Sequence, residues 1–128
     1  MNIKKLTQHF SVSEQIKYSD IDDIAELGFK TIINNRPDRE VLFQPRTKTL
    51  DRHAANAGLK YFYLPVISGN ITQKNIDHFR AMLTDAEGPV LAFCRTGTRS
   101  ANLWAKVNPD DLADADISAI GAQAGYAL

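Results

Sequence analysis

The segment Cys94–Ser100 (Cys-Arg-Thr-Gly-Thr-Arg-Ser) contains the only cysteine of the chain together with two arginines. An apolar run, Val90–Phe93, precedes it, and a helical pattern follows it over residues 101–106. A strand, a short loop and a helix in this order form an anion cradle, because loop N–H groups point inward and the helix N-terminus adds partial positive charge. Such a cradle favours the thiolate form of Cys94, which would then act as a nucleophile.

The residues around Cys94 suit this chemistry individually. Arg99 stands where the loop becomes a helix, so its guanidinium can fold back over a tetrahedral oxyanion and bind it bidentately. Arg95 follows the nucleophile directly, and we expect it to project outward or to guard the entrance. Gly97 allows a positive φ or a close approach of the backbone to a ligand. Ser100 is expected to cap the helix or to donate a hydrogen bond to the thiolate. The other expected anion-binding residues of the loop are Thr96 and Thr98.

A buried structural cysteine is the alternative interpretation of Cys94. The polar and charged neighbours of the cysteine argue against it. For Arg99 the alternative is a surface ion pair.

Composition narrows the possible functions. The length of 128 residues predicts a single domain over residues 1–128. Lys+Arg equals Asp+Glu at 15 each, which gives no support for binding to nucleic acid or to a membrane surface. One cysteine cannot form an intramolecular disulfide, and we identify neither a signal peptide nor an apolar run of roughly 20 residues. We therefore expect a cytoplasmic protein.

No Cys/His cluster has metal-ligand spacing, so no metal or cofactor is predicted.

Short apolar runs alternate with helical patterns, which predicts an α/β domain: a small, mainly parallel sheet flanked by helices on both faces. Strands are expected over residues 11–16 (at the sheet edge), 29–33, 59–64 and 90–93. Helices are expected over 21–27 with a capping box of Ser19 and Asp22, over 44–57, after the cap Thr72, after the cysteine loop, and as one or two helices over 110–124. Because ligands bind at the carboxyl ends of parallel strands, the segments 34–38, 65–70 and 94–99 should converge on one site.

Two charged residues of the first of these segments are further candidates. Arg36 could bind a charged substrate, with a solvated turn or a salt bridge to Glu40 as the alternative. Asp38 is the available substitute for a proton donor, although a turn residue after Pro37 is the favoured interpretation. Three histidines are expected at the surface: His9, His53 and His78.

Five segments together resemble a known family. They are Asn-Asn-Arg-Pro-Asp-Arg-Glu at 34–40, Leu-Pro-Val at 64–66, Ser-Gly-Asn-Ile-Thr at 68–72, Gly-Pro-Val-Leu-Ala at 88–92 and the cysteine loop at 94–100. The chain resembles, from Phe10 to Tyr126, the phosphatase-like domain of the β-lactamase-hydrolase-like proteins. The resemblance implies a fold similar to the protein tyrosine and dual-specificity phosphatases. In relatives this domain can be fused to a metallo-β-lactamase-fold sulfur dioxygenase, which implies a possible partner of that kind.

The loop departs from the pattern of those phosphatases, which is His-Cys-x5-Arg. Here Phe93 takes the place of the histidine, and the arginine comes one residue earlier, at position 99. The string resembles the active loop of single-domain rhodaneses, Cys-Arg-x-Gly-x-Arg-Ser, which carries sulfane sulfur as a persulfide. In addition, the loop 65–70 has no carboxylate to protonate a leaving oxygen, a step that phosphate-ester cleavage usually needs.

These observations favour a sulfurtransferase on a phosphatase-like fold. Cys94 would take sulfane sulfur from a small donor, and an external thiol acceptor would remove it because the chain has no second cysteine. A cysteine-dependent phosphatase working through a Cys94 phospho-intermediate on an oxyanion substrate is the second hypothesis. The third is a non-catalytic anion-binding module that docks to a sulfur dioxygenase.

Overall fold

The computed structural model describes residues 1–128, whose core is a five-stranded sheet in the order β1-β2-β5-β3-β4. Neighbouring strands from β2 to β4 run parallel, and only β1 is antiparallel to its partner. The chain therefore has the mainly parallel sheet that its sequence predicts. The strands are β1 (Ile3–Lys5), β2 (Phe10–Ser13), β3 (Thr31–Asn34), β4 (Lys60–Tyr63) and β5 (Val90–Phe93).

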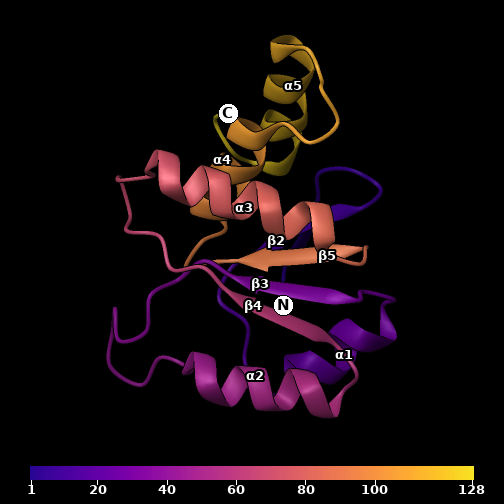
Figure 1. The fold of residues 1–128 in the computed structure, drawn as a ribbon. Helices are drawn as coiled ribbons and strands as arrows, with labels where there is room; N and C mark the ends of the chain where they lie inside the picture. The colour runs from indigo at the N-terminus through magenta and orange to yellow at the C-terminus, as the bar shows by residue number, and fades with distance from the viewer.

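Helices cover both faces of the sheet (Figure 1). Helices α1 (Asp20–Glu26) and α2 (Thr47–Asn56) lie on one face, and α3 (Gln73–Asp85), α4 (Thr98–Val107) and α5 (Asp114–Ala124) gather on the other. No helix of this chain has the length and apolar character that crossing a membrane would require.

Successive side chains of the central strands point to opposite faces of the sheet, and this alternation divides the core into two clusters. Leu91 and Phe93 of β5 pack with the residues of α1 and α2, whereas Val90 and Ala92 pack with those of α3 and α4. All four residues of β5 are buried, as expected for a central strand covered on both faces. The cysteine loop therefore leaves a fully buried strand, as β2 and β3 also are.

Strand β2 differs from its prediction. It spans Phe10–Ser13 rather than 11–16, and it lies inside the sheet, because β1 pairs with it on the outer side. The sequence reading missed β1, which has only three residues, two of them lysines. Ile16, expected in the strand, lies beyond it and packs in the cluster under α1 and α2.

Two helix starts also differ. Ser19 makes no side-chain cap to α1, so the predicted capping box is wrong there; the box that forms joins Thr72 and Asn75 at the start of α3. Helix α2 begins three residues after the predicted Gln44, whose side-chain amide instead binds the Pro37 carbonyl and the Glu40 N–H. The segment 110–124 contains one helix, α5, which ends at Gly125 in the left-handed region.

Trp104 of α4 anchors the larger cluster. Its side chain is fully buried and stacks on Phe10 at 6.4 Å between ring centroids, while Phe10 meets Phe79 of α3 edge-on at 6.0 Å. Replacing Trp104 by Ala should lower the free energy of unfolding by about 3–5 kcal/mol, because a large cavity remains. Trp104→Phe should cost less, since it also removes the buried, unpartnered indole N–H. Chemical denaturation measures both.

Leu27→Ala is the matched control, because that side chain is 65% exposed and should cost within about 0.5 kcal/mol. Equal losses for Trp104→Ala and Leu27→Ala would contradict the packing described for α4.

Candidate active site

Cys94 follows β5 directly and is fully buried at the floor of its loop. The backbone N–H of Gly97 donates a hydrogen bond to the cysteine Sγ at 3.1 Å. Gly97 is the N-cap of α4 and has φ 90°, a left-handed conformation that glycine adopts without strain. The sulfur therefore lies at the positive end of α4, as the strand–loop–helix pattern predicts.

The loop is held from outside through two of its carbonyl groups. Gln15 donates its backbone N–H to the Arg95 carbonyl at 3.2 Å, and the Tyr126 hydroxyl donates to the Thr96 carbonyl at 3.0 Å. Burial, and then the charge of Cys94, raise the pKa of Tyr126, so this phenol remains a neutral donor at neutral pH. Gln15 and Tyr126, which are far apart in the sequence, thus support the cysteine loop.

Ser100 is placed differently from its prediction. The cap of α4 is Gly97, and the buried Ser100 hydroxyl donates to the Asn35 side-chain oxygen at 2.8 Å, so neither predicted role is observed. Asn35 also donates its side-chain amide to the Leu64 carbonyl and its backbone N–H to the Phe93 carbonyl. The ends of β3, β4 and β5 are therefore tied together at Asn35.

Arg99 is fixed by an ion pair. Its Nη1 and Nη2 atoms donate to the two carboxylate oxygens of Glu40 at 2.7 and 3.0 Å, and Nη1 also donates to the Val66 carbonyl at 2.9 Å. The hydrogen bond to Glu40 is the main cause that raises the pKa of Arg99, and the charge of the nearby Cys94 acts in the same direction. The arginine that the sequence singles out is thus held in one orientation near Cys94.

Arg36 binds the same carboxylate. Its Nε donates to a Glu40 oxygen at 2.8 Å and its Nη1 to the Gln15 side chain at 3.0 Å, so the salt-bridge alternative for Arg36 is the one observed. Hydrogen bonding from Arg99, opposed by burial and supported by Arg36, lowers the pKa of Glu40. Sequence reasoning missed Glu40 as a site residue. The available signal was a single carboxylate placed four residues after an arginine in the segment 34–40.

Asp38 occupies a turn. Its carboxylate accepts the backbone N–H of Thr47 at 2.9 Å in the first turn of α2, and its own N–H donates to the Tyr63 hydroxyl. The Asp38 carboxylate is thus bound to the start of α2 and not to the cysteine loop.

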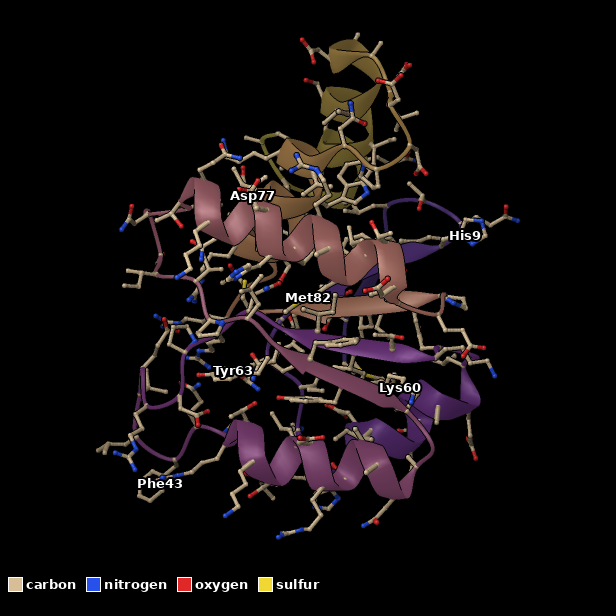
Figure 2. All side chains as sticks on the ribbon, viewed as in Figure 1. His9, Phe43, Lys60, Tyr63, Asp77 and Met82 are labelled. Atoms are coloured by element: carbon tan, nitrogen blue, oxygen red, sulfur yellow. The ribbon has the colours of Figure 1, made fainter.

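The three histidines are exposed, as predicted; Figure 2 shows His9 at the edge of the molecule.

A cavity of about 700 Å³ opens beside the cysteine loop. The exposed Arg95 lies in its wall, together with residues of the loop after β4 and of α4. All charged residues of the wall are positive, and only one lining residue is hydrophobic. The arrangement can hold an anion beside the cysteine loop, whose residues Arg95 and Thr96 line the wall. The lining residues are Ser68, Gly69, Ile71, Arg95, Thr96, Thr98, Arg99, Asn102 and Lys106.

Comparison with known sequences identifies the domain type. The family model of the "Beta-lactamase hydrolase-like protein, phosphatase-like domain" matches residues 2–111. A β-lactamase hydrolase-like protein of Agrobacterium fabrum is 35% identical over 104 residues, which cover 81% of this chain. The chain spans only 24% to 30% of the length of the curated relatives that it matches.

Solved structures share the fold. A "putative phosphatase" from Neisseria meningitidis Z2491 is 38% identical and has a TM-score of 0.87, with 100% of this chain and 92% of that chain covered. The structure called Tk-PTP in the active form has a TM-score of 0.72 at 12% identity, with 98% and 85% covered. The fold is thus that of the protein tyrosine and dual-specificity phosphatases.

Glu40→Gln should destabilise the protein in a pH-dependent way. Because the folded-state pKa of Glu40 lies below its ordinary value of 4.5, the ionised carboxylate stabilises the fold fully above that value. The difference in unfolding free energy between the wild type and Glu40→Gln should therefore be largest near neutral pH. It should shrink as the pH falls from 4.5 through the lowered pKa. Denaturant titrations at several pH values measure this difference, and a pH-independent difference would contradict the ion-pair role.

Gly97→Ala should disrupt the loop for two reasons. Its φ of 90° disfavours any residue with a Cβ, at a cost of about 1–2 kcal/mol, and the new Cβ would overlap the Tyr126 hydroxyl. Gly58→Ala is the matched control, because Gly58 has φ 79° with no atom within 4 Å of the added Cβ. We expect Gly97→Ala to destabilise more than Gly58→Ala in thermal denaturation. Equal effects would show that Tyr126 does not pack against the loop.

Proposed function

The chain belongs to the family of phosphatase-like domains of the β-lactamase hydrolase-like proteins, and from that premise we propose that it is a cysteine-dependent phosphatase. The observation that carries the proposal is the Cys94 sulfur at the N-terminus of α4, beside a guanidinium held by Glu40. A nucleophile and a fixed cation next to it are what transfer of a phosphoryl group requires.

In the proposed reaction the Cys94 thiolate attacks phosphorus and the bond from phosphorus to the leaving oxygen breaks, with the electron pair passing to that oxygen. Water then cleaves the sulfur–phosphorus bond and restores the thiolate. Three of the five N–H bonds of Arg99 are used by Glu40 and Val66. The Nε–H and one Nη2–H of Arg99 remain for the phosphoryl oxygens, together with the positive end of α4.

The site supplies little acid catalysis. Glu40 is held ionised by two arginines, and Asp38 is bound to the start of α2. The loop 65–70 contributes no carboxylate. The proposed phosphatase therefore acts best on substrates whose leaving oxygen is weakly basic, because such an oxygen departs without a protein proton donor.

Sulfur transfer is the second candidate function, favoured by the short Cys-x4-Arg loop and by the same shortage of proton donors. Cys94 would accept sulfane sulfur as a persulfide. An external thiol would receive it, since no other cysteine exists in the chain. A sulfur dioxygenase that consumes a persulfide product would be a chemically consistent partner.

The two functions separate in one set of assays. With p-nitrophenyl phosphate we expect turnover that Cys94→Ser abolishes and that Arg99→Lys lowers by about 10²-fold or more, because lysine cannot reproduce the fork to Glu40 and phosphate. Intact mass after incubation with thiosulfate tests the other function: one added sulfur atom on wild-type protein but not on Cys94→Ser would support sulfur transfer. Absence of aryl phosphate turnover would contradict the phosphatase proposal.

A further inference from the structure

The cavity beside the cysteine loop extends beyond what a single phosphoryl group needs. Along α4, Thr98, Asn102 and Lys106 follow one another at intervals of four residues, so they share one face of the helix. Thr98 begins the helix beside the catalytic loop, and Lys106 lies two turns farther along. The wall therefore continues from the nucleophile toward a second positive charge.

Neither Arg95 nor Lys106 takes part in an ion pair, whereas Arg99 and Arg36 share the single negative charge of Glu40. The cavity wall contains no carboxylate. Two unpaired cations in one concave surface attract an anion more strongly than either would alone on an open surface. A substrate in this cavity therefore meets Arg95 and Lys106 in addition to Arg99, which holds the reacting group.

The wall also offers few apolar contacts to an aromatic leaving group. Ile71 is the only hydrophobic residue that lines it, and no aromatic side chain does. The remaining uncharged lining residues are Ser68, Gly69, Thr96, Thr98 and Asn102, which offer hydroxyl, amide and backbone groups. Such a surface favours binding of a compact polar anion over binding of a phenyl ring.

We propose that Arg95, Asn102 and Lys106 form a subsite for a second phosphate group, and that the substrate class is a phosphoanhydride of the pyrophosphate type. The proposal rests on the proposed phosphatase function. It explains how a site with no free acid can work: at neutral pH a terminal phosphate of this type can carry its own proton.

The step balances without an added reagent. The Cys94 thiolate attacks one phosphorus, and the anhydride P–O bond breaks. Its electron pair stays with the second phosphate, which leaves as hydrogen phosphate with the proton it already carried. Water then cleaves the sulfur–phosphorus bond and releases the first phosphate. Lys106 and Arg95 stabilise the negative charge that collects on the departing group.

The first test measures binding in the absence of turnover. In Cys94→Ser, calorimetry should show that pyrophosphate binds more tightly than orthophosphate. Adding Lys106→Met should weaken pyrophosphate binding about tenfold while leaving orthophosphate binding unchanged, because a charge-assisted hydrogen bond is lost. Lys106→Arg should retain the preference. Equal weakening of both ligands, or of neither, would overturn the subsite.

Lys60→Met is the matched control. Lys60 is an exposed lysine at the opposite end of β4 from Tyr63, and Figure 2 shows the two residues at the two ends of the strand. Removing this charge changes the net charge equally but should leave the preference for pyrophosphate intact. If Lys60→Met reduced the preference as much as Lys106→Met, the effect would be one of general charge and the subsite would be wrong.

The second test measures turnover by phosphate release. Wild-type protein should hydrolyse pyrophosphate, and Lys106→Met should lower kcat/KM for pyrophosphate by a larger factor than kcat/KM for p-nitrophenyl phosphate. Hydrolysis of p-nitrophenyl phosphate with no preference for pyrophosphate in either test would overturn the subsite and leave the phosphatase function standing. A Lys106-dependent binding preference with no hydrolysis of either compound would instead support the subsite and contradict the phosphatase function.

Discussion

The ion pair between Glu40 and Arg99 is the interaction on which the arrangement of the site depends. Arg99 is 9% exposed, and a guanidinium at that depth is costly to bury unless its donors find partners. Glu40 supplies two acceptors and Val66 a third. Because these partners come from the segments after β3 and β4, the pair fixes the start of α4 against two other strand ends. Arg36 then binds the same carboxylate, so one negative charge organises two buried cations.

This use of Glu40 has a chemical consequence. A carboxylate held ionised by two arginines positions Arg99 near Cys94, and it is a poor proton donor. The site thus combines a well-ordered cation with little acid catalysis. Both the phosphatase and the sulfur-transfer hypotheses are compatible with this shortage of proton donors. The shortage favours substrates whose leaving group departs without being protonated by the protein. In the proposed subsite, the unpaired cations of the cavity wall, Arg95 and Lys106, would favour substrates with charge beyond the reacting group.

The cysteine loop is also supported from behind by residues that are distant in the sequence. Tyr126 donates to the Thr96 carbonyl and lies where a Cβ at Gly97 would have to go. Lys4 of β1 lies over the Tyr126 ring, 4.8 Å from its centroid. Tyr126 stands beyond residues 2–111, which the family model covers, so the structure adds a loop contact that this match does not include. The unpredicted strand β1 and the end of the chain thus meet at the loop.

Local features of the sequence were sufficient to predict the strand–loop–helix geometry at Cys94, the parallel sheet with helices on both faces, and the meeting of three strand ends. Hydrophobic periodicity, a glycine at a helix start and a lone cysteine are features of a few neighbouring residues, so they can be recognised without knowledge of the fold. The hydrogen-bond partners of the polar side chains could not be predicted in this way. Ser100 binds Asn35 across 65 residues and Arg99 binds Glu40 across 59. Only the packing of β3 beside β5 brings those groups within hydrogen-bond distance, and so only the tertiary structure decided that Glu40 holds the arginine and that Arg95 and Lys106 remain free to meet a ligand.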